Sequence, residues 1–273
     1  SRIFIINRGI KFERKMEMSL FKKVLASIGI GSAKVDARLE NTAYRQGDVV
    51  NGVIYIQGGD VEQFIEDVYM KVYTQYVKEV DDHKVYVSQE LVRHKVKESF
   101  VLGKGEKKEF PFSLLLPYET PITAGRVKVW VQTELGISNA IDPTDKDYIS
   151  VTPSPVMEGI FSALEDMGFR IHEAECKKTS YQYGSSLPFL QEFEFKPYRG
   201  SFRGKLDEVE VTLLHQDANE TEIYLQIDRK ARGIGGFLSE ILETDETNLK
   251  LSFTPDDISN MKHKMHQLFH RYS

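Results

Sequence analysis

Residues 110–135 read FPFSLLLPYETPITAGRVKVWVQTEL, and this segment decides the fold class of the 273-residue chain. Apolar side chains recur at every second position up to Leu116, which is typical of a β-strand with one buried face. Pro117 and Pro121 cannot donate to a strand ladder, so the strand ends and a loop follows. A second alternation starts at Val127. The segment therefore predicts a strand, a crossing loop and a second strand.

The same period-two alternation recurs over residues 33–152, in about seven strands separated by turns, which indicates an antiparallel β-sandwich. The longest strands expected are 65–76 and 85–101, joined by a polar turn. Pro153-Ser154-Pro155 then interrupts the pattern, because proline disfavours both helix and central strand. Alternation resumes after it. We predict a mainly β protein with two immunoglobulin-like antiparallel sandwiches in tandem, over residues 18–152 and 157–273, with a linker at 153–156.

Short helices are expected at three places. Ser19 is a favourable N-cap for an N-terminal helix over residues 20–28. A second helix follows the linker and stops at Gly168. At the C-terminus, Thr254 and Pro255 provide a cap and a proline at the first helical position.

Composition and charge limit the classes of protein to which the chain can belong. The apolar fraction of 41% is enough for a folded core. The net charge is -5, and neither half has the basic excess that binding a phosphate backbone requires, so nucleic acid is not an expected partner. Cys176 is the single cysteine, which excludes an intramolecular disulfide and favours a reducing compartment. No apolar run approaches the roughly 20 residues of a membrane span, so a cytoplasmic, bacterial protein is expected.

Residues 1–17 do not match the chain that follows them. They lack the order of charged, apolar and small residues that defines a signal peptide. We interpret them as an extension that is non-native or lies upstream of the true start.

Three histidines, His263, His266 and His270, share one face of the C-terminal helix, and neutral imidazole is a common zinc ligand. One helix rarely supplies three ligands to one ion, and Lys262 and Lys264 add repelling charge. A solvated face or a protein contact is therefore the favoured interpretation, with a metal site or a pH-dependent contact as alternatives.

The other polar groups favour ordinary structural roles. Asp142, Asp145 and Asp147 carry oxygen ligands but lack the spacing of a calcium loop, so turn formation or charge pairing is favoured. Cys176 precedes two lysines, yet no histidine in its local sequence marks a catalytic pair. Phosphate-cradle and nucleophile-elbow motifs are absent. We expect no catalytic residue, no cofactor and no metal.

Two segments resemble arrestin-like domains. Residues 44–54, YRQGDVVNGVI, are similar to the early strand pair of that fold, and residues 110–135 to its phenylalanine-rich strand, crossing loop and valine-aromatic strand. With residues 18–31, MSLFKKVLASIGIG, the likeness extends over nearly the whole chain from Met18 to the Spo-zero-M family of sporulation-control proteins of spore-forming bacteria. This resemblance implies two arrestin-like β-sandwich domains and a cytoplasmic regulator of entry into sporulation without known catalysis. No motif matches the ionic core or phosphate-sensing residues of arrestins.

The first hypothesis is a non-enzymatic regulatory adaptor or scaffold that controls the initiation of sporulation through protein–protein interactions. Two amphipathic helix faces are the expected interaction residues, although each could equally pack within the chain. They are Leu20, Phe21, Val24 and Leu25 near the N-terminus, and Met261, Met265, Leu268 and Phe269 near the C-terminus. Other proteins are the expected partners, with a homodimer as one alternative. The second hypothesis is a peripheral membrane or lipid-responsive protein acting through the helix at 20–28, and the third is a metal-dependent protein.

Overall fold

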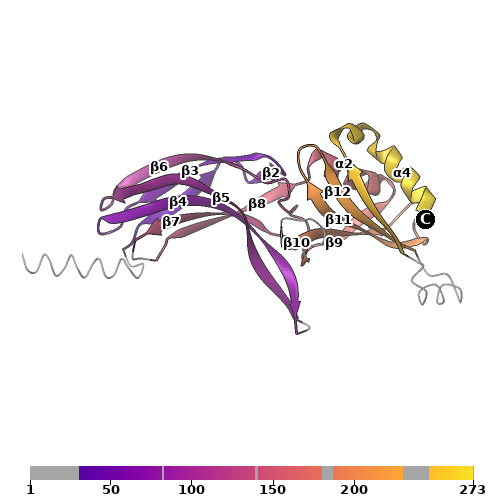
Figure 1. Ribbon diagram of the computed structural model, residues 1–273, viewed down its shortest axis with the longest axis horizontal. Coiled ribbons are helices and arrows are strands. Elements are labelled where there is room, and N and C mark those ends of the chain that lie inside the picture. Colours follow the sequence, from indigo (N-terminus) through magenta and orange to yellow (C-terminus); the bar gives the residue numbers. More distant parts are fainter. Residues whose placement is uncertain (1–30, 82, 139–140, 180–186, 230–245, 273) are drawn as a thin grey trace, which may run out of the picture.

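The computed structural model is mainly β, which confirms the predicted fold class. The chain forms two lobes that lie side by side along its long axis (Figure 1). The first half of the sequence builds one lobe and the second half builds the other. The residues that the structure describes are 31–81, 83–138, 141–179, 187–229 and 246–272.

The first lobe contains two sheets packed face to face. Its strands are β1 (Lys34–Leu39), β2 (Ala43–Arg45), β3 (Val49–Gln57), β4 (Gln63–Val80), β5 (His83–Leu102), β6 (Lys107–Leu115), β7 (Val129–Ile137) and β8 (Thr144–Thr152). One sheet has the order β1-β3-β6, and the other contains β5, β4, β7, β8 and β2. Alternate residues such as Ile54 of β3 and Val72 of β4 are fully buried between them. The period-two pattern of the sequence therefore places one face of each sheet in the core.

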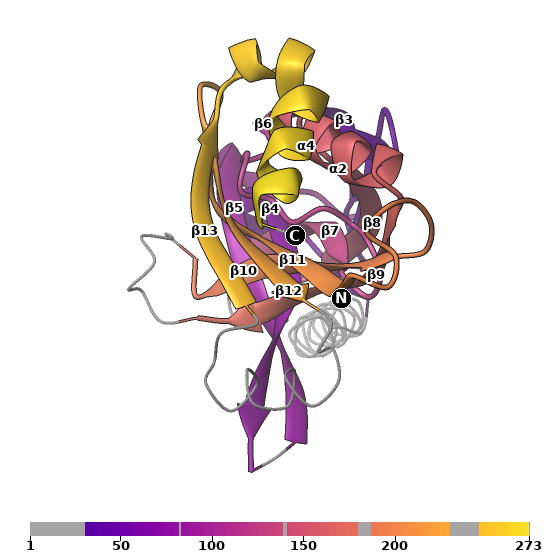
Figure 2. The same cartoon turned by 90° about the vertical axis from the view of Figure 1, so that its right-hand side faces the viewer.

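The second lobe consists of one antiparallel sheet and the helices that cover it. Its strands are β9 (Phe169–Lys178), β10 (Phe189–Pro197), β11 (Leu206–Gln216), β12 (Thr221–Arg229) and β13 (Glu246–Phe253). The helices are α2 (Pro155–Asp166), the 3-10 helix η2 (Pro255–Asn260) and α4 (Met261–Tyr272). Here the structure differs from the expected sandwich, because α2 and α4, rather than a second sheet, pack on the described strands (Figure 2).

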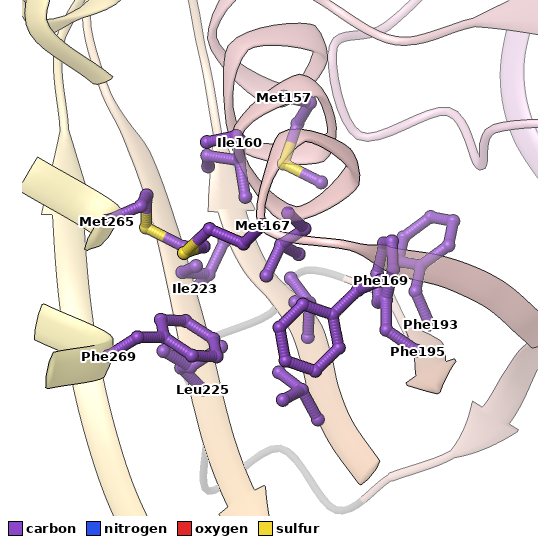
Figure 3. Close-up of a cluster of buried hydrophobic side chains, with 14 of the residues drawn as sticks. Met157, Ile160, Met167, Phe169, Phe193, Phe195, Ile223, Leu225, Met265 and Phe269 are labelled. Carbon is purple, nitrogen blue, oxygen red and sulfur yellow. The ribbon is translucent and has the colours of Figure 1, made fainter. Parts of the chain in front are cut away.

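The core of the second lobe explains this difference. Met157, Ile160 and Leu164 recur at helical spacing on α2 and are all fully buried. From the other helix, Met265 and Phe269 point toward the sheet (Figure 3). The two helices therefore provide the apolar surface that a second sheet provides in the first lobe.

Helix α2 begins inside the predicted linker. The side-chain oxygen of Ser154 accepts a hydrogen bond from the Met157 backbone N–H at 3.3 Å, so Ser154 is the N-cap. Pro155 then occupies the first helical turn, where its missing N–H costs nothing. The Pro-Ser-Pro sequence is thus a helix start as well as a break in the strand pattern. The division into domains at 153–156 stays a prediction.

The C-terminal helix is interrupted near its start. Asp257 accepts a hydrogen bond from the Thr254 backbone N–H at 2.7 Å, so the predicted cap is present. The first turn is nevertheless a 3-10 helix, whose tighter winding rotates Ile258 off the apolar stripe of α4. Ile258 is 38% exposed as a result.

Replacing Phe269 tests whether α4 is an integral part of the core. We expect Phe269→Ala to lower the free energy of unfolding by about 3–5 kcal/mol, because it removes a fully buried ring. Urea denaturation followed by circular dichroism measures this change. His263→Ala on the exposed face of the same helix is the control, with an expected change within about 0.5 kcal/mol. Equal effects of the two variants would contradict the packing described.

Candidate functional site

The crossing loop between β6 and β7, residues 116–128, joins the two lobes. Ile122 belongs by sequence to the first half of the chain, yet it is buried in the core of the second lobe. Ala124 packs against the same core. The loop predicted from its two prolines is therefore an inter-lobe connector as well as a link between two strands.

Two glutamines of the second lobe hold the backbone of this loop. Gln191 of β10 accepts a hydrogen bond from the Ile122 N–H at 2.8 Å and donates to the Ile122 carbonyl at 2.7 Å. Gln216 of β11 donates to the Tyr118 carbonyl at 2.8 Å. Both glutamines are at most 3% exposed. They satisfy backbone groups that would otherwise be buried without partners.

A third buried glutamine approaches the loop from the first lobe. Gln46 donates to the Thr120 carbonyl at 2.7 Å and accepts from the Ser154 N–H at 3.1 Å. Ser154 in turn donates from its hydroxyl to Gln216 at 2.9 Å. The neighbouring Gly47 has a φ of +86°, and a Cβ there would lie 2.5 Å from the Tyr118 ring. Hydrogen bonds and close packing thus connect both lobes through one buried network.

A small apolar cluster forms a second contact between the lobes. Cys176 and Phe189 of the second lobe are buried there with Val127 of the loop. Tyr76 of β4 stacks on Phe189, with ring centroids 5.5 Å apart. Beside them, Val77 of β4 pairs with β9 in parallel, so that a ten-stranded sheet continues from one lobe into the other.

Beyond this contact, β4 and β5 continue as a hairpin that extends away from both lobes (Figure 1). We define the arm as residues 77–80 and 83–86, which pair with each other across the hairpin. The two strands contain 18 and 20 residues, whereas strands average about 5–6 residues. An ion pair between Lys84 and Glu175, with 3.3 Å between nitrogen and oxygen, ties the arm to β9.

The arm exposes apolar side chains to solvent. Val80 is 42% exposed, Val85 39% and Tyr86 46%. The pairing register places Val80 and Val85 on one face of the ribbon and Tyr86 on the other. A two-stranded ribbon is marginally stable alone, so the inter-lobe contact at its base supports it. Exposed apolar residues on a projecting element are typical of a protein-binding surface.

The predicted C-terminal interaction residues lie in or against the core. Met261, Met265 and Phe269 are at most 1% exposed in the second lobe, and Leu268 is partly buried against the same cluster. The sequence left two roles open for these residues, binding a partner and packing within the chain. Their burial shows that they pack within the chain. The N-terminal set, Leu20, Phe21, Val24 and Leu25, lies outside the described residues.

The histidine stripe is on the exposed face of α4. His266 and His270 lie next to each other, with ring centroids 4.5 Å apart, and His263 is one turn away. Lys262 and Lys264 form ion pairs with aspartates, so their charge is balanced. Within the described part of the chain, no group of three or more His, Cys, Asp or Glu side chains is placed to hold a metal ion.

The aspartates before and within β8 have separate surroundings. Asp142 accepts a hydrogen bond from the Ile137 N–H at 2.9 Å, as a turn residue does. Asp145 accepts one from the Ala37 N–H of β1 at 2.8 Å, which closes the edge between the two sheets. Burial raises the pKa of Asp147 to about 6, and the charges of Asp145 and Asp36 act in the same direction.

Cys176 is buried, and its burial raises the pKa of the thiol above the ordinary range. A protonated, inaccessible thiol is a poor nucleophile. This position agrees with the interpretation of Cys176 as a strand residue.

Sequence reasoning found the two long strands and the turn that form the arm, but not the arm itself. Period-two alternation is the same for a strand inside a sheet and for one that leaves it. The available signal was length, because the two strands contain 18 and 20 residues, several times the average of about 5–6. Strand length alone does not show that the hairpin leaves the sheet, or in which direction it projects.

The described residues define a two-lobed, mainly β protein with a buried polar junction and a projecting hairpin. Comparison with known proteins gives the family. The sequence model described as SpoOM protein (Spo0M) matches residues 21–231. The chain belongs to the Spo0M family.

Two similar proteins support this assignment. The sporulation-control protein spo0M of Bacillus subtilis (strain 168) is 40% identical over 245 residues, which are 89% of this chain and 93% of that protein. The crystal structure of Spo0M from Bacillus subtilis superposes with a TM-score of 0.78 at 36% identity, covering 89% of this chain and all of that one.

Gln191 provides a test of the buried junction. We expect Gln191→Leu to lower the free energy of unfolding by about 2–4 kcal/mol, because both backbone groups of Ile122 lose their partner in a buried site. Thermal and urea unfolding measure the loss. Gln57→Leu, at an exposed glutamine, is the matched control with an expected change within about 0.5 kcal/mol. A loss as small as that of the control would mean that the loop is held by other contacts.

Asp147 predicts a pH dependence of stability. Its pKa is higher in the folded protein than in the unfolded chain, so the folded state binds the proton more strongly. The contribution of Asp147 to stability therefore falls as the pH rises from about 4 to about 6. We expect Asp147→Asn to be more stable than the parent protein at pH 7 and no more stable at pH 4. Urea unfolding across this range checks the result, with Asp256→Asn as the exposed control. A pH-independent difference would contradict the assignment.

Proposed function

We propose that this protein is a non-enzymatic regulatory adaptor in the control of sporulation, and that it acts by binding other proteins through the arm. The observation that carries the proposal is the projecting ribbon with Val80, Val85 and Tyr86 exposed. Exposed valine and tyrosine side chains bury apolar area when a partner covers them, and tyrosine is enriched among residues that dominate binding energy.

The backbone of the arm adds a second means of binding. Outward from the Val77–Lys177 pair, the arm strands pair with each other in the described structure. Their outer edges carry N–H and C=O groups that a partner strand can pair with. The buried junction supports the arm at its base, so binding does not require the lobes to reorganise.

The biological setting follows from the relatives. The Bacillus subtilis protein that is 40% identical to this chain over 245 residues is a sporulation-control protein. We also propose that the first lobe is an arrestin-like domain, as the resemblance of residues 44–54 and 110–135 implies. Adaptors of this kind place partners next to one another, and they need surfaces rather than a catalytic group.

Two alternatives have less support. A membrane role rests on the predicted helix at residues 20–28, which lies outside the described residues. No helix in the described part of the chain is both long enough and apolar enough to cross a bilayer. A metal-dependent role draws on the histidine stripe, whose three rings are exposed to solvent on one helix.

The arm can be tested in a spore-forming strain that lacks its own copy of the gene. We expect the variant Val80→Ser/Val85→Ser/Tyr86→Ser to sporulate as the deletion strain does, because its partner contact is lost. Replacement of solvent-exposed residues should change the free energy of unfolding by less than about 1 kcal/mol, which unfolding measurements would verify. Heat-resistant spore counts measure function, and cross-linking in the same cells measures partner recovery.

The matched control uses another exposed apolar pair. Val49 and Leu115 are cross-strand neighbours in the first lobe and are 48% and 57% exposed. The variant Val49→Ser/Leu115→Ser should keep wild-type sporulation and cross-linking. Normal sporulation of the arm variant would count against the proposal.

A further inference from the structure

A row of three aromatic side chains crosses the outer face of the first lobe. Tyr73 of β4, Trp130 of β7 and Tyr148 of β8 are direct cross-strand neighbours. The ring centroids of Tyr73 and Trp130 are 5.7 Å apart and nearly parallel, and those of Trp130 and Tyr148 are 6.0 Å apart. We call these three residues the aromatic row. Tyr148 is 57% exposed, so one end of the row faces solvent.

Most charged groups around the row are already paired. Arg93 contacts Glu90 at 3.0 Å, and Lys71 contacts Glu134 at 2.5 Å. Glu90 also accepts a hydrogen bond from the Tyr73 hydroxyl at 3.0 Å. These pairs neutralise the part of the face formed by β4, β5 and β7.

The exposed end of the aromatic row differs, because the two lysines beside it form no ion pair with a carboxylate of the described residues. Lys128 and Lys146 are both exposed and take part in no ion pair among the described residues. The Lys146 ammonium lies 3.8 Å from the centre of the Trp130 ring and 4.8 Å from that of Tyr148. The pKa of the Tyr148 hydroxyl is lowered, first by a hydrogen bond with Lys146 and further by the charges of Lys146 and Lys128. Two unneutralised ammonium groups therefore lie around one exposed tyrosine.

The aromatic row also contains an unsatisfied donor. Trp130 is only 4% exposed, and its indole N–H has no hydrogen-bond partner. Buried donors of this kind are rare because each one costs free energy. The Lys146 ammonium lies over the face of the indole in an exposed cation–π contact, which is weaker than a charge-assisted hydrogen bond to a carboxylate. A carboxylate that attracts Lys146 would uncover the face of the indole ring.

We propose that Lys128, Lys146 and the aromatic row bind an acidic, extended segment of a partner protein. Carboxylates of that segment pair with Lys128 and Lys146, Lys146 leaves the indole, and Trp130 and Tyr148 contact the segment directly. The inference rests on the proposed function in taking the occupant to be a protein.

Charge and position identify this occupant. The two free ammonium groups complement carboxylates, whereas the net charge of -5 on the whole chain disfavours a nucleic-acid strand. The row spans three neighbouring strands, a shape that suits an extended chain. In both Figure 1 and Figure 2, the arm projects to the side on which the sheet of β4 and β7 lies, away from the layer of β3 and β6. A partner that contacts the arm therefore approaches the face that carries the row.

The single tryptophan makes the test direct, because the chain contains no other. The probe is a short synthetic peptide in which glutamate alternates with threonine, a residue that favours extended structure. Titrating it into the full chain should change Trp130 fluorescence saturably, as Lys146 leaves the indole. The double variant Lys128→Gln/Lys146→Gln should weaken binding by about tenfold or more, and added salt should weaken binding to the parent protein.

Three controls make the result specific. The variant Lys34→Gln/Lys107→Gln removes two exposed lysines of the other sheet and should leave peptide affinity within about twofold. A peptide with lysine in place of glutamate should cause no saturable change. Inorganic phosphate and a single-stranded oligonucleotide should bind more weakly than the acidic peptide.

The proposal is overturned if the acidic peptide causes no saturable change, or if both double variants lose affinity equally. Tighter binding of phosphate or of the oligonucleotide would also overturn it, since the occupant would then be of another class. All of these variants leave the arm unchanged. Failure here is therefore distinguishable from failure of the arm variant in sporulating cells.

Discussion

Three buried glutamines hold the crossing loop between the lobes, and the arrangement of the rest of the molecule depends on them. A loop that leaves a sheet carries backbone N–H and C=O groups that need partners outside the strand ladder. Gln46 reaches these groups from the first lobe, and Gln191 and Gln216 reach them from the second. Because each amide both donates and accepts, neutral side chains complete the network without the cost of burying charge.

The position of the arm follows from this junction. Strand β4 pairs with β7 in one lobe and meets β9 of the other at Val77, so it passes through the contact between the lobes. Tyr76 and Phe189 stack at the same place and fix the point where the hairpin leaves the sheet. A ribbon that would be marginal alone is thereby held in a defined direction. The arm and the aromatic row of the first lobe then face the same side of the molecule.

The order of strands could be predicted because local patterns are sufficient for it. Alternation of apolar residues placed β6 and β7 on either side of a loop, and the strands of the second lobe were visible in the same way. The layer that covers the second sheet was not predictable by this route. Helix α2 starts at Pro155, and proline by itself indicates a break in the strand pattern. The apolar stripe of α4 is equally suited by its sequence to the core and to a partner, and it lies in the core. Whether the apolar face of a helix packs in the core of its own chain or against a partner depends on which surface lies opposite it in the folded protein.

The sequence by itself determined the mainly β class, the presence of a loop between Leu116 and Val127 and the likeness to the Spo0M family, since these depend on neighbouring residues and on residue identity. Only the tertiary structure decided that Ile122 enters the second core, that three glutamines meet one loop, and that Lys146 covers Trp130 without a carboxylate. The physical reason is that these contacts join residues far apart in the chain. A glutamine or a lysine has the same local pattern whether it ends in solvent or on a buried partner, and only the packing of distant strands selects between the two.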